Sequence, residues 1–232
     1  MEPGGRTSET ATFAQALASL KRRGSSLLLV GPAYEEAHLP ASRRLLGSAE
    51  EATERARLLV VTDGVASAGS RLAGVASETV RTLTYEAPTR GGAAAAVGTD
   101  DAGVGAGGLA AEAPPPDLAS LCRRIDEAID EVEAERGQLA PAELRVCFDS
   151  LVPLLEQYEE REVFTFLHAL TAATREVGAM AHYHLPVPAD DPLVGTLAPL
   201  FDAVIELRST PDGAQQRWRL TDEDVVTEWL PV

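Results

Sequence analysis

Lysine is nearly absent from this sequence. Lys21 is the only one in 232 residues, and the other nineteen cationic side chains are arginine. Acidic residues outnumber basic ones by 36 to 20, which gives a net charge of −16 at pH 7. Nucleic acids and anionic membranes are bound by clustered cations that neutralise phosphate, so we expect neither as a partner. Abundant carboxylates keep a chain hydrated when salt screens its charge, and the composition is typical of a halophilic protein.

Cysteine and long apolar runs are scarce as well. The two cysteines are Cys122 and Cys147, and without a Cys-x-x-Cys spacing they indicate neither a zinc site nor a disulfide framework. We expect each to be a small core residue. No apolar run reaches the roughly 18 residues that a membrane helix needs. Residues 1–12 are polar, with no apolar stretch ahead of a cleavage site, so a cytoplasmic location is expected.

Apolar residues form short runs that alternate with amphipathic segments. The expected strands cover residues 25–31, 58–62, 80–85, 144–148, 179–185 and 203–207. The expected helices cover residues 12–23 after a cap at Thr10 or Thr12, 33–46 with a kink at Pro40, 117–136, 151–158 and 161–177. Strands that are apolar on both faces and alternate with helices indicate an α/β fold, with a mostly parallel sheet between two helical layers. Residues 215–220 and 225–230 are expected to close the chain as a β-hairpin that carries Trp218 and Trp229 at the sheet edge.

The chain divides into a tail, one domain and one insertion. Residues 1–11 are polar and are expected to form a flexible tail, and residues 12–232 are expected to form a single domain. Residues 87–116 are mostly Ala, Gly, Pro, Thr and Asp, and they end in three prolines. Such a segment cannot bury enough apolar surface to order itself, so we expect a disordered insertion there.

One stretch of the chain resembles a nucleotide motif. Residues 144–151 read Leu-Arg-Val-Cys-Phe-Asp-Ser-Leu, and this apolar strand ending in Asp149 resembles the second nucleotide motif of RecA-like ATPases, especially KaiC-like proteins. The order of the surrounding elements is similar too, from residues 13–31 at the start to residues 201–207 and the closing hairpin. The chain resembles a haloarchaeal family of RecA/KaiC-like proteins over most of residues 12–232, except the insertion.

The resemblance implies a fold and a site. The fold would be a three-layer RecA/KaiC-like sandwich. Domains of this type often assemble edge to edge, so the resemblance also implies that copies of this chain can form a homo-oligomer. Asp149 would hold a magnesium-bound water. The nucleotide-binding residues implied by the resemblance are Gly31, Arg43, Arg44, Asp149 and Ser150.

The phosphate-binding loop departs from the pattern that this family needs. The motif Gly-x-x-x-x-Gly-Lys-Ser/Thr cradles phosphates with backbone N–H groups and a lysine. Residues 31–38 instead read Gly-Pro-Ala-Tyr-Glu-Glu-Ala-His. The second glycine is missing, Pro32 has no N–H, Glu35 and Glu36 add negative charge, and Lys21 precedes the strand. We therefore expect no catalytic residues and no nucleotide hydrolysis by the usual mechanism.

Several other side chains admit two interpretations. Asp149, His182 and His184 are candidate metal ligands, because His182 and His184 share one face of a strand; the alternative is that all three are structural hydrogen-bonding groups. The basic clusters at 21–23 and 43–44 are expected to pair with carboxylates of their own chain; the alternative is contact with an acidic partner or a nucleotide. His38 and His168 are expected on helices, with no evident partner. Ser150 lacks the Gly-x-Ser-x-Gly context of a hydrolase nucleophile.

These observations leave three functional hypotheses. The first is a non-catalytic, degenerate-loop RecA/KaiC-like domain that regulates or signals by binding another protein. The second is a nucleotide-binding sensor with weak or no ATP hydrolysis, using Arg43, Arg44 and Asp149. The third is a divergent enzyme that uses the strand edge at His182 and His184. The first predicts no cofactor, whereas the second predicts ATP with Mg²⁺.

Overall fold

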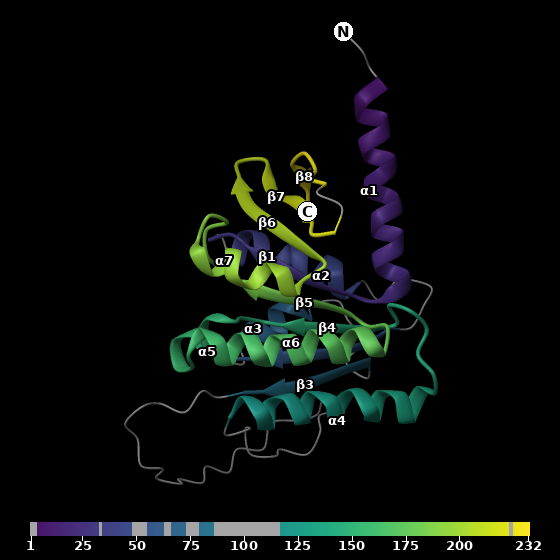
Figure 1. Ribbon diagram of the computed structural model, residues 1–232, viewed down its shortest axis with the longest axis vertical. Coiled ribbons are helices and arrows are strands. Elements are labelled where there is room, and N and C mark those ends of the chain that lie inside the picture. Colours follow the sequence, from purple (N-terminus) through teal and green to yellow (C-terminus); the bar gives the residue numbers. More distant parts are fainter. Residues whose placement is uncertain are drawn as a thin grey trace.

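The centre of the molecule is a sheet built from the apolar runs (Figure 1). The computed structural model describes residues 4–32, 34–47, 55–62, 66–72, 79–85, 117–222 and 225–232. Eight strands form one sheet in the order β3-β2-β4-β5-β1-β6-β7-β8. The strands are β1 (Ser25–Val30), β2 (Ala56–Val61), β3 (Val80–Thr84), β4 (Leu144–Phe148), β5 (Met180–Leu185), β6 (Ala203–Thr210), β7 (Gly213–Leu220) and β8 (Leu230–Pro231). Strands β1 to β6 are mutually parallel, whereas β7 pairs antiparallel with both β6 and β8.

Helices cover both faces of this sheet. Among the described residues they are α1 (Gly4–Arg23), the π-helix η1 (Tyr34–His38), α2 (Leu39–Leu46), α3 (Ala66–Arg71), α4 (Leu118–Arg136), α5 (Val152–Gln157), α6 (Glu160–Glu176), α7 (Pro192–Leu197) and the 3₁₀ turn η3 (Ala198–Leu200). The core on one face packs against α4 to α7, and the cores on the other face pack against α1, η1, α2 and α3. Figure 1 shows α4 and α6 lying along one face, while α1 extends beyond the sheet.

The alternation of side chains along β1 explains why two helical layers form. Leu28 and Val30 belong to the core under α4 and α6, whereas Leu27 and Leu29 belong to the core under α1 and α2. Successive strand residues point to opposite faces, and every residue of β1, β2, β4 and β5 is buried. A strand that is apolar on both faces is stable only between two layers, so the α/β prediction is confirmed.

The ends of the chain differ from the sequence expectation. Helix α1 begins at Gly4, so it includes residues that we expected in the tail. The hairpin joins β6 to β7 around a turn at residues 211–212, and the predicted strand at 225–230 is reduced to the short β8 and one bridge from Arg219 to Val226. The predicted insertion at 87–116 lies outside the described residues. Within the part of the chain that is described, no helix is long and apolar enough to cross a membrane.

Two tryptophans pack near the sheet edge, as expected. Trp218 is buried on β7, where its ring meets Phe13 edge-on at 5.7 Å between centroids. Trp229 lies just before β8, with the guanidinium carbon of Arg208 3.8 Å from the centre of its ring. Both rings therefore anchor the C-terminal strands to the rest of the fold.

The carboxyl ends of β1, β5 and β4 lie next to one another, because these parallel strands are neighbours in the sheet. Gly31 follows β1 directly and has φ +133°, a conformation that favours glycine. A Cβ atom on Gly31 would lie 2.2 Å from the carbonyl oxygen of Leu207 in β6. The chain can therefore leave β1 past β6 only without a side chain at this position.

We predict that Gly31→Ala lowers the free energy of unfolding by on the order of 3 kcal/mol, from backbone strain and the clash with Leu207. The matched control is Gly195→Ala in α7, where the added Cβ meets no heavy atom within 4 Å. Since alanine favours helix over glycine by up to about 1 kcal/mol, the control should be neutral or stabilising. Urea denaturation of both variants measures the difference, and equal effects would contradict it.

Candidate functional site

A group of polar side chains is buried at the carboxyl edge of the sheet, on the face covered by η1, α2 and α3. We call it the buried imidazole cluster, and its members are His38, Ser42, Arg71, Cys147, His182 and His184. Each is at most 2% exposed. The strands bring part of it together, because Cys147 of β4 is the register partner of His182 in β5. His184 lies two residues further along β5, on the same face.

A chain of hydrogen bonds links the cluster to the loop after β1. Arg71 Nη1 lies 2.9 Å from His184 Nε2, and His184 Nδ1 lies 2.8 Å from His38 Nδ1. His38 Nε2 in turn lies 2.8 Å from the carbonyl oxygen of Gly31. The first group of this chain, the guanidinium of Arg71, can only donate, and the last, the carbonyl oxygen of Gly31, can only accept. The direction of the hydrogen bond between the two imidazoles follows from these two groups. His184 therefore carries its proton on Nδ1, and His38 carries its proton on Nε2.

This network requires neutral imidazoles, and burial favours them. Burial, reinforced by the charge of Arg71, lowers the pKa of His38 to about 4, although its bond to Gly31 opposes the shift. Burial and Arg71 also hold the pKa of His182 and of His184 well below the usual value. Burial raises the pKa of the Cys147 thiol to about 11. The histidines and the thiol are thus uncharged at neutral pH.

Ser42 of α2 connects the second imidazole to the thiol. Its Oγ lies 3.0 Å from Nε2 of His182 and 3.4 Å from Sγ of Cys147. A hydroxyl can donate one bond and accept others, so Ser42 satisfies polar atoms on two neighbouring strands. The helix α2 is therefore attached to the sheet by polar contacts as well as by its apolar side chains.

Three members of the cluster have the atom types of a metal site. The ligand atoms of Cys147, His182 and His184 lie within 4.8 Å of one another, and thiolate and imidazole are zinc ligands. However, the guanidinium of Arg71 already donates to His184 Nε2. A divalent cation here would face a buried positive charge and would have to displace that bond. The arrangement fits a hydrogen-bonded cluster better than a metal centre.

Asp149 does not join this candidate metal group in the described structure; it links β4 to β2 instead. Its Oδ1 accepts hydrogen bonds from the backbone N–H of Thr62 at 2.7 Å and from the Thr62 hydroxyl at 2.8 Å. Its own carbonyl oxygen accepts from Arg71 Nη2 at 2.9 Å. The structural interpretation of this strand-end aspartate, a carboxylate bonded to nearby N–H groups, is therefore the one that the contacts support. Ser150 beside it is buried, and its Oγ lies 3.3 Å from the N–H of Val152.

The loop position that would bind phosphate is occupied by the chain's own groups. The N–H of Gly31 donates to the carbonyl oxygen of Val187 at 2.8 Å, and Pro32 has no N–H to offer. Ala37 and His38, at the end of η1, are fully buried. Gly31 is therefore part of the packed interior, with both of its backbone polar groups engaged.

Arg43 and Arg44 lie on the surface of α2, outside the buried imidazole cluster. Arg43 Nε donates to the carbonyl oxygen of Ser70 at 2.8 Å, and Arg44 Nη1 lies 3.4 Å from that of Pro231. The expectation of carboxylate partners is not met by these contacts, which are to backbone oxygens at two different places. It is met by Arg23, which pairs with Asp202 and Asp222 at 3.2 and 3.3 Å.

Sequence reasoning missed two essential members of the cluster. His38 was expected on a helix without a partner, yet it contacts both His184 and Gly31. The signal was its place seven residues after Gly31, at the start of the crossover that begins at the same sheet edge. Arg71 lies on a short helix among small and polar residues, and nothing in that local pattern marks it as buried.

We predict that the free energy of unfolding decreases as the pH falls from about 6.5 to 5. The unfolded chain takes up protons on its histidines below about pH 6.5, whereas the folded chain cannot protonate His38, His182 and His184 until a much lower pH. Each buried histidine contributes up to about 1.4 kcal/mol per pH unit. His168→Gln is the matched control. Because His168 is exposed on α6, this variant should keep the pH dependence of the free energy of unfolding. Denaturation at several pH values tests this; constant or rising stability towards pH 5 would contradict it.

Comparison with known proteins adds one finding to this geometry. Among curated proteins, none matches the chain. A family model described as "Family of unknown function (DUF7504)" matches residues 24–207, a span that runs from the residue before β1 into β6 and includes the whole buried imidazole cluster. The chain therefore belongs to the DUF7504 family.

Proposed function

We propose that this chain is a RecA/KaiC-like domain without ATPase activity, which acts in regulation or signalling by binding another protein. The proposal is supported by the mostly parallel sheet and by Asp149 at the carboxyl end of β4, at the same sheet edge as the loop after β1. Function in open α/β sheets is usually located at the carboxyl ends of the strands. The side chains at this carboxyl edge are therefore the ones that distinguish a catalytic from a non-catalytic role.

The observation that carries the proposal is the side chain of His38 in the loop after β1. It is fully buried and hydrogen-bonded at both ring nitrogens, to Gly31 and to His184. A phosphate-binding loop needs free backbone N–H groups and room for the anion. Here an imidazole and the backbone of β6 take up that room, so binding a triphosphate would require the loop to unpack.

The charges support the same conclusion. Lys21 lies at the end of α1, before β1, and thus near the amino end of the strand. Arg71 is close to Asp149, but its guanidinium is fully buried and donates to His184 and to a backbone carbonyl. Phosphoryl transfer depends on cations placed against the transferring group. No such arrangement is found among the described side chains of this edge.

The other two hypotheses rest on weaker observations. A nucleotide sensor would have to use Arg43 and Arg44, which point to different carbonyl groups on the surface. An enzyme that uses His182 and His184 would need a substrate to reach side chains that are at most 2% exposed. The sensor therefore stays an outcome of the test below, and the enzyme is the least supported of the three.

We predict that ATP with Mg²⁺ gives no saturable heat in calorimetric titration and that no phosphate is released on long incubation. The Arg43→Ala/Arg44→Ala double variant is the control, since a surface site built on these arginines would lose affinity in it. Magnesium-dependent binding with a Kd below about 100 µM (about 5.5 kcal/mol of binding free energy), lost in the double variant, would establish the sensor instead.

We also predict that the tagged chain retains a defined protein in near-stoichiometric amount when captured from its own cells at the native salt concentration. An unrelated acidic protein of similar net charge is the control, because charge alone attracts basic proteins. Quantitative mass spectrometry of both captures makes the comparison. Recovery of the chain alone, at every salt concentration, would contradict a role in binding another protein.

A further inference from the structure

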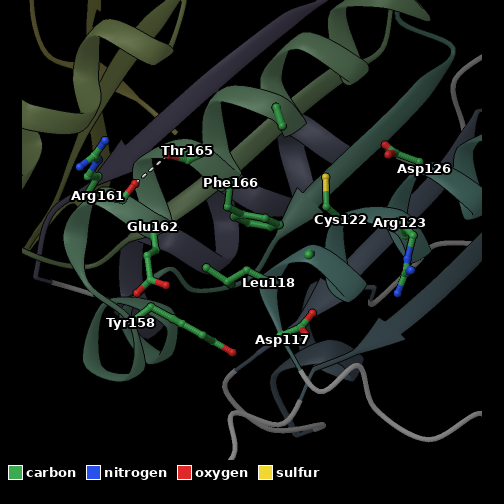
Figure 2. Close-up of a pocket in the computed structure, with 12 residues that line it drawn as sticks. Asp117, Leu118, Cys122, Arg123, Asp126, Tyr158, Arg161, Glu162, Thr165 and Phe166 are labelled. Carbon is green, nitrogen blue, oxygen red and sulfur yellow. Dashed lines mark hydrogen bonds between the residues drawn. The ribbon is translucent and has the colours of Figure 1, made fainter.

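A groove lies between α4 and α6, on the face of the sheet opposite the buried imidazole cluster (Figure 2). Its volume is about 670 Å³, within the range of pockets that hold small ligands. It is lined by the first half of α4 and by residues from Tyr158 to Ala169. We call it the α4–α6 groove. It is separate from the edge on which the proposed function depends.

The floor of the groove is apolar. Leu118 and Cys122 lie one turn apart on α4 and face Phe166 of α6 across it, as Figure 2 shows. The ring of Tyr158 closes one end, and its hydroxyl is already bonded to that of Tyr85. An apolar surface of this kind binds the hydrocarbon part of a ligand by excluding water.

Asp126 lies at the other end of the groove, one turn beyond Cys122. Its Oδ1 is buried and has no hydrogen-bond partner among the described residues. Burial and the nearby Asp130 and Glu127 raise the pKa of this carboxyl. A buried carboxylate oxygen without a donor costs free energy, and a donor supplied by a ligand would remove that cost.

The other two carboxylates of the groove have structural roles. Asp117 caps α4 by accepting from the N–H of Ser120 at 2.7 Å. Glu162 accepts from the N–H of Glu159 at 3.1 Å in the capping box of α6. Among the described residues, Asp126 is the lining carboxylate with a buried oxygen that has no hydrogen-bond donor. A positive charge suits Asp126, because the neighbouring Asp130 and Glu127 are acidic. The lining also contains Arg123 and Arg161, but both are exposed, and Arg123 donates to the hydroxyl of Ser120 at 3.0 Å.

We propose that the α4–α6 groove binds a small amphiphilic amine, with its hydrocarbon chain on Leu118, Cys122 and Phe166 and its ammonium group donating to Asp126. The apolar floor supplies the affinity, and the unpartnered carboxylate oxygen supplies the preference for a cation over an anion or a neutral alcohol. Neither the loop after β1 nor the buried imidazole cluster takes part.

Three probes of equal chain length test the proposal on the full chain: octylamine, which is protonated at neutral pH, octanoate and 1-octanol. Calorimetric titration at one fixed salt concentration should give a 1:1 complex with octylamine and at least tenfold weaker binding of the other two. Equal affinity for all three probes, or no binding of octylamine, would overturn the proposal.

Three substitutions test where the ligand binds. Asp126→Asn should remove the preference for octylamine, whereas Glu176→Gln, at an exposed position of α6 outside the groove lining, should retain it. Ala169→Trp, on the exposed side of the groove, should weaken all binding by filling the space. Circular dichroism checks that each variant is folded. Unchanged octylamine binding in the folded Asp126→Asn protein would refute the assignment of the ammonium site.

Discussion

The buried guanidinium of Arg71 imposes an order on the whole carboxyl edge of the sheet. A cation without access to water needs acceptors within the protein, and here they include the Nε2 atom of His184 and the carbonyl oxygen of Asp149. Because Arg71 can only donate, His184 must turn its own proton towards His38, which in turn must donate to Gly31. One donor on α3 thus determines which nitrogen carries the proton in two imidazoles, the second of which donates to the carbonyl oxygen of Gly31 after β1. Hydrogen bonds that all run in one direction thus connect α3, β5, η1 and the loop after β1, which are distant in the sequence.

The two faces of the sheet consequently offer different surfaces. At the edge where α/β proteins commonly bind ligands, the histidines and the thiol contact Ser42, Arg71 and one another. Asp149 bonds to Thr62 and Arg71. On the opposite face, the helices α4 and α6 leave a groove with an apolar floor and a carboxylate oxygen that lacks a partner. The described contacts of the central edge thus stabilise the fold, whereas the helical layer on the opposite face has an open groove.

The sequence was sufficient for the sheet but only partly for the site. The apolar runs at β1, β2, β4 and β5 predicted buried parallel strands correctly, because burial on both faces leaves an unmistakable composition. The spacing of His182 and His184 also predicted a shared face. The partners of these residues could not be predicted from the sequence, because Arg71 and His38 come from crossover segments whose position depends on tertiary packing. The expected closing hairpin was displaced for a related reason: β7 pairs with the long β6 along its whole length, which leaves only a short segment for β8.

The π-helix η1 makes the length of the loop after β1 important. A π-turn holds one residue more than an α-helical turn, and the extra residue lies in the segment Tyr34–His38 just ahead of α2. Deletion of a single codon ahead of His38 would remove that extra residue and turn the preceding chain by about 100° relative to His38 and α2, which would move the carbonyl oxygen of Gly31 away from His38 Nε2. The hydrogen bond that ends the chain from Arg71 to Gly31 therefore depends on the number of residues between Gly31 and His38, and the length of this loop is the feature to compare among family members.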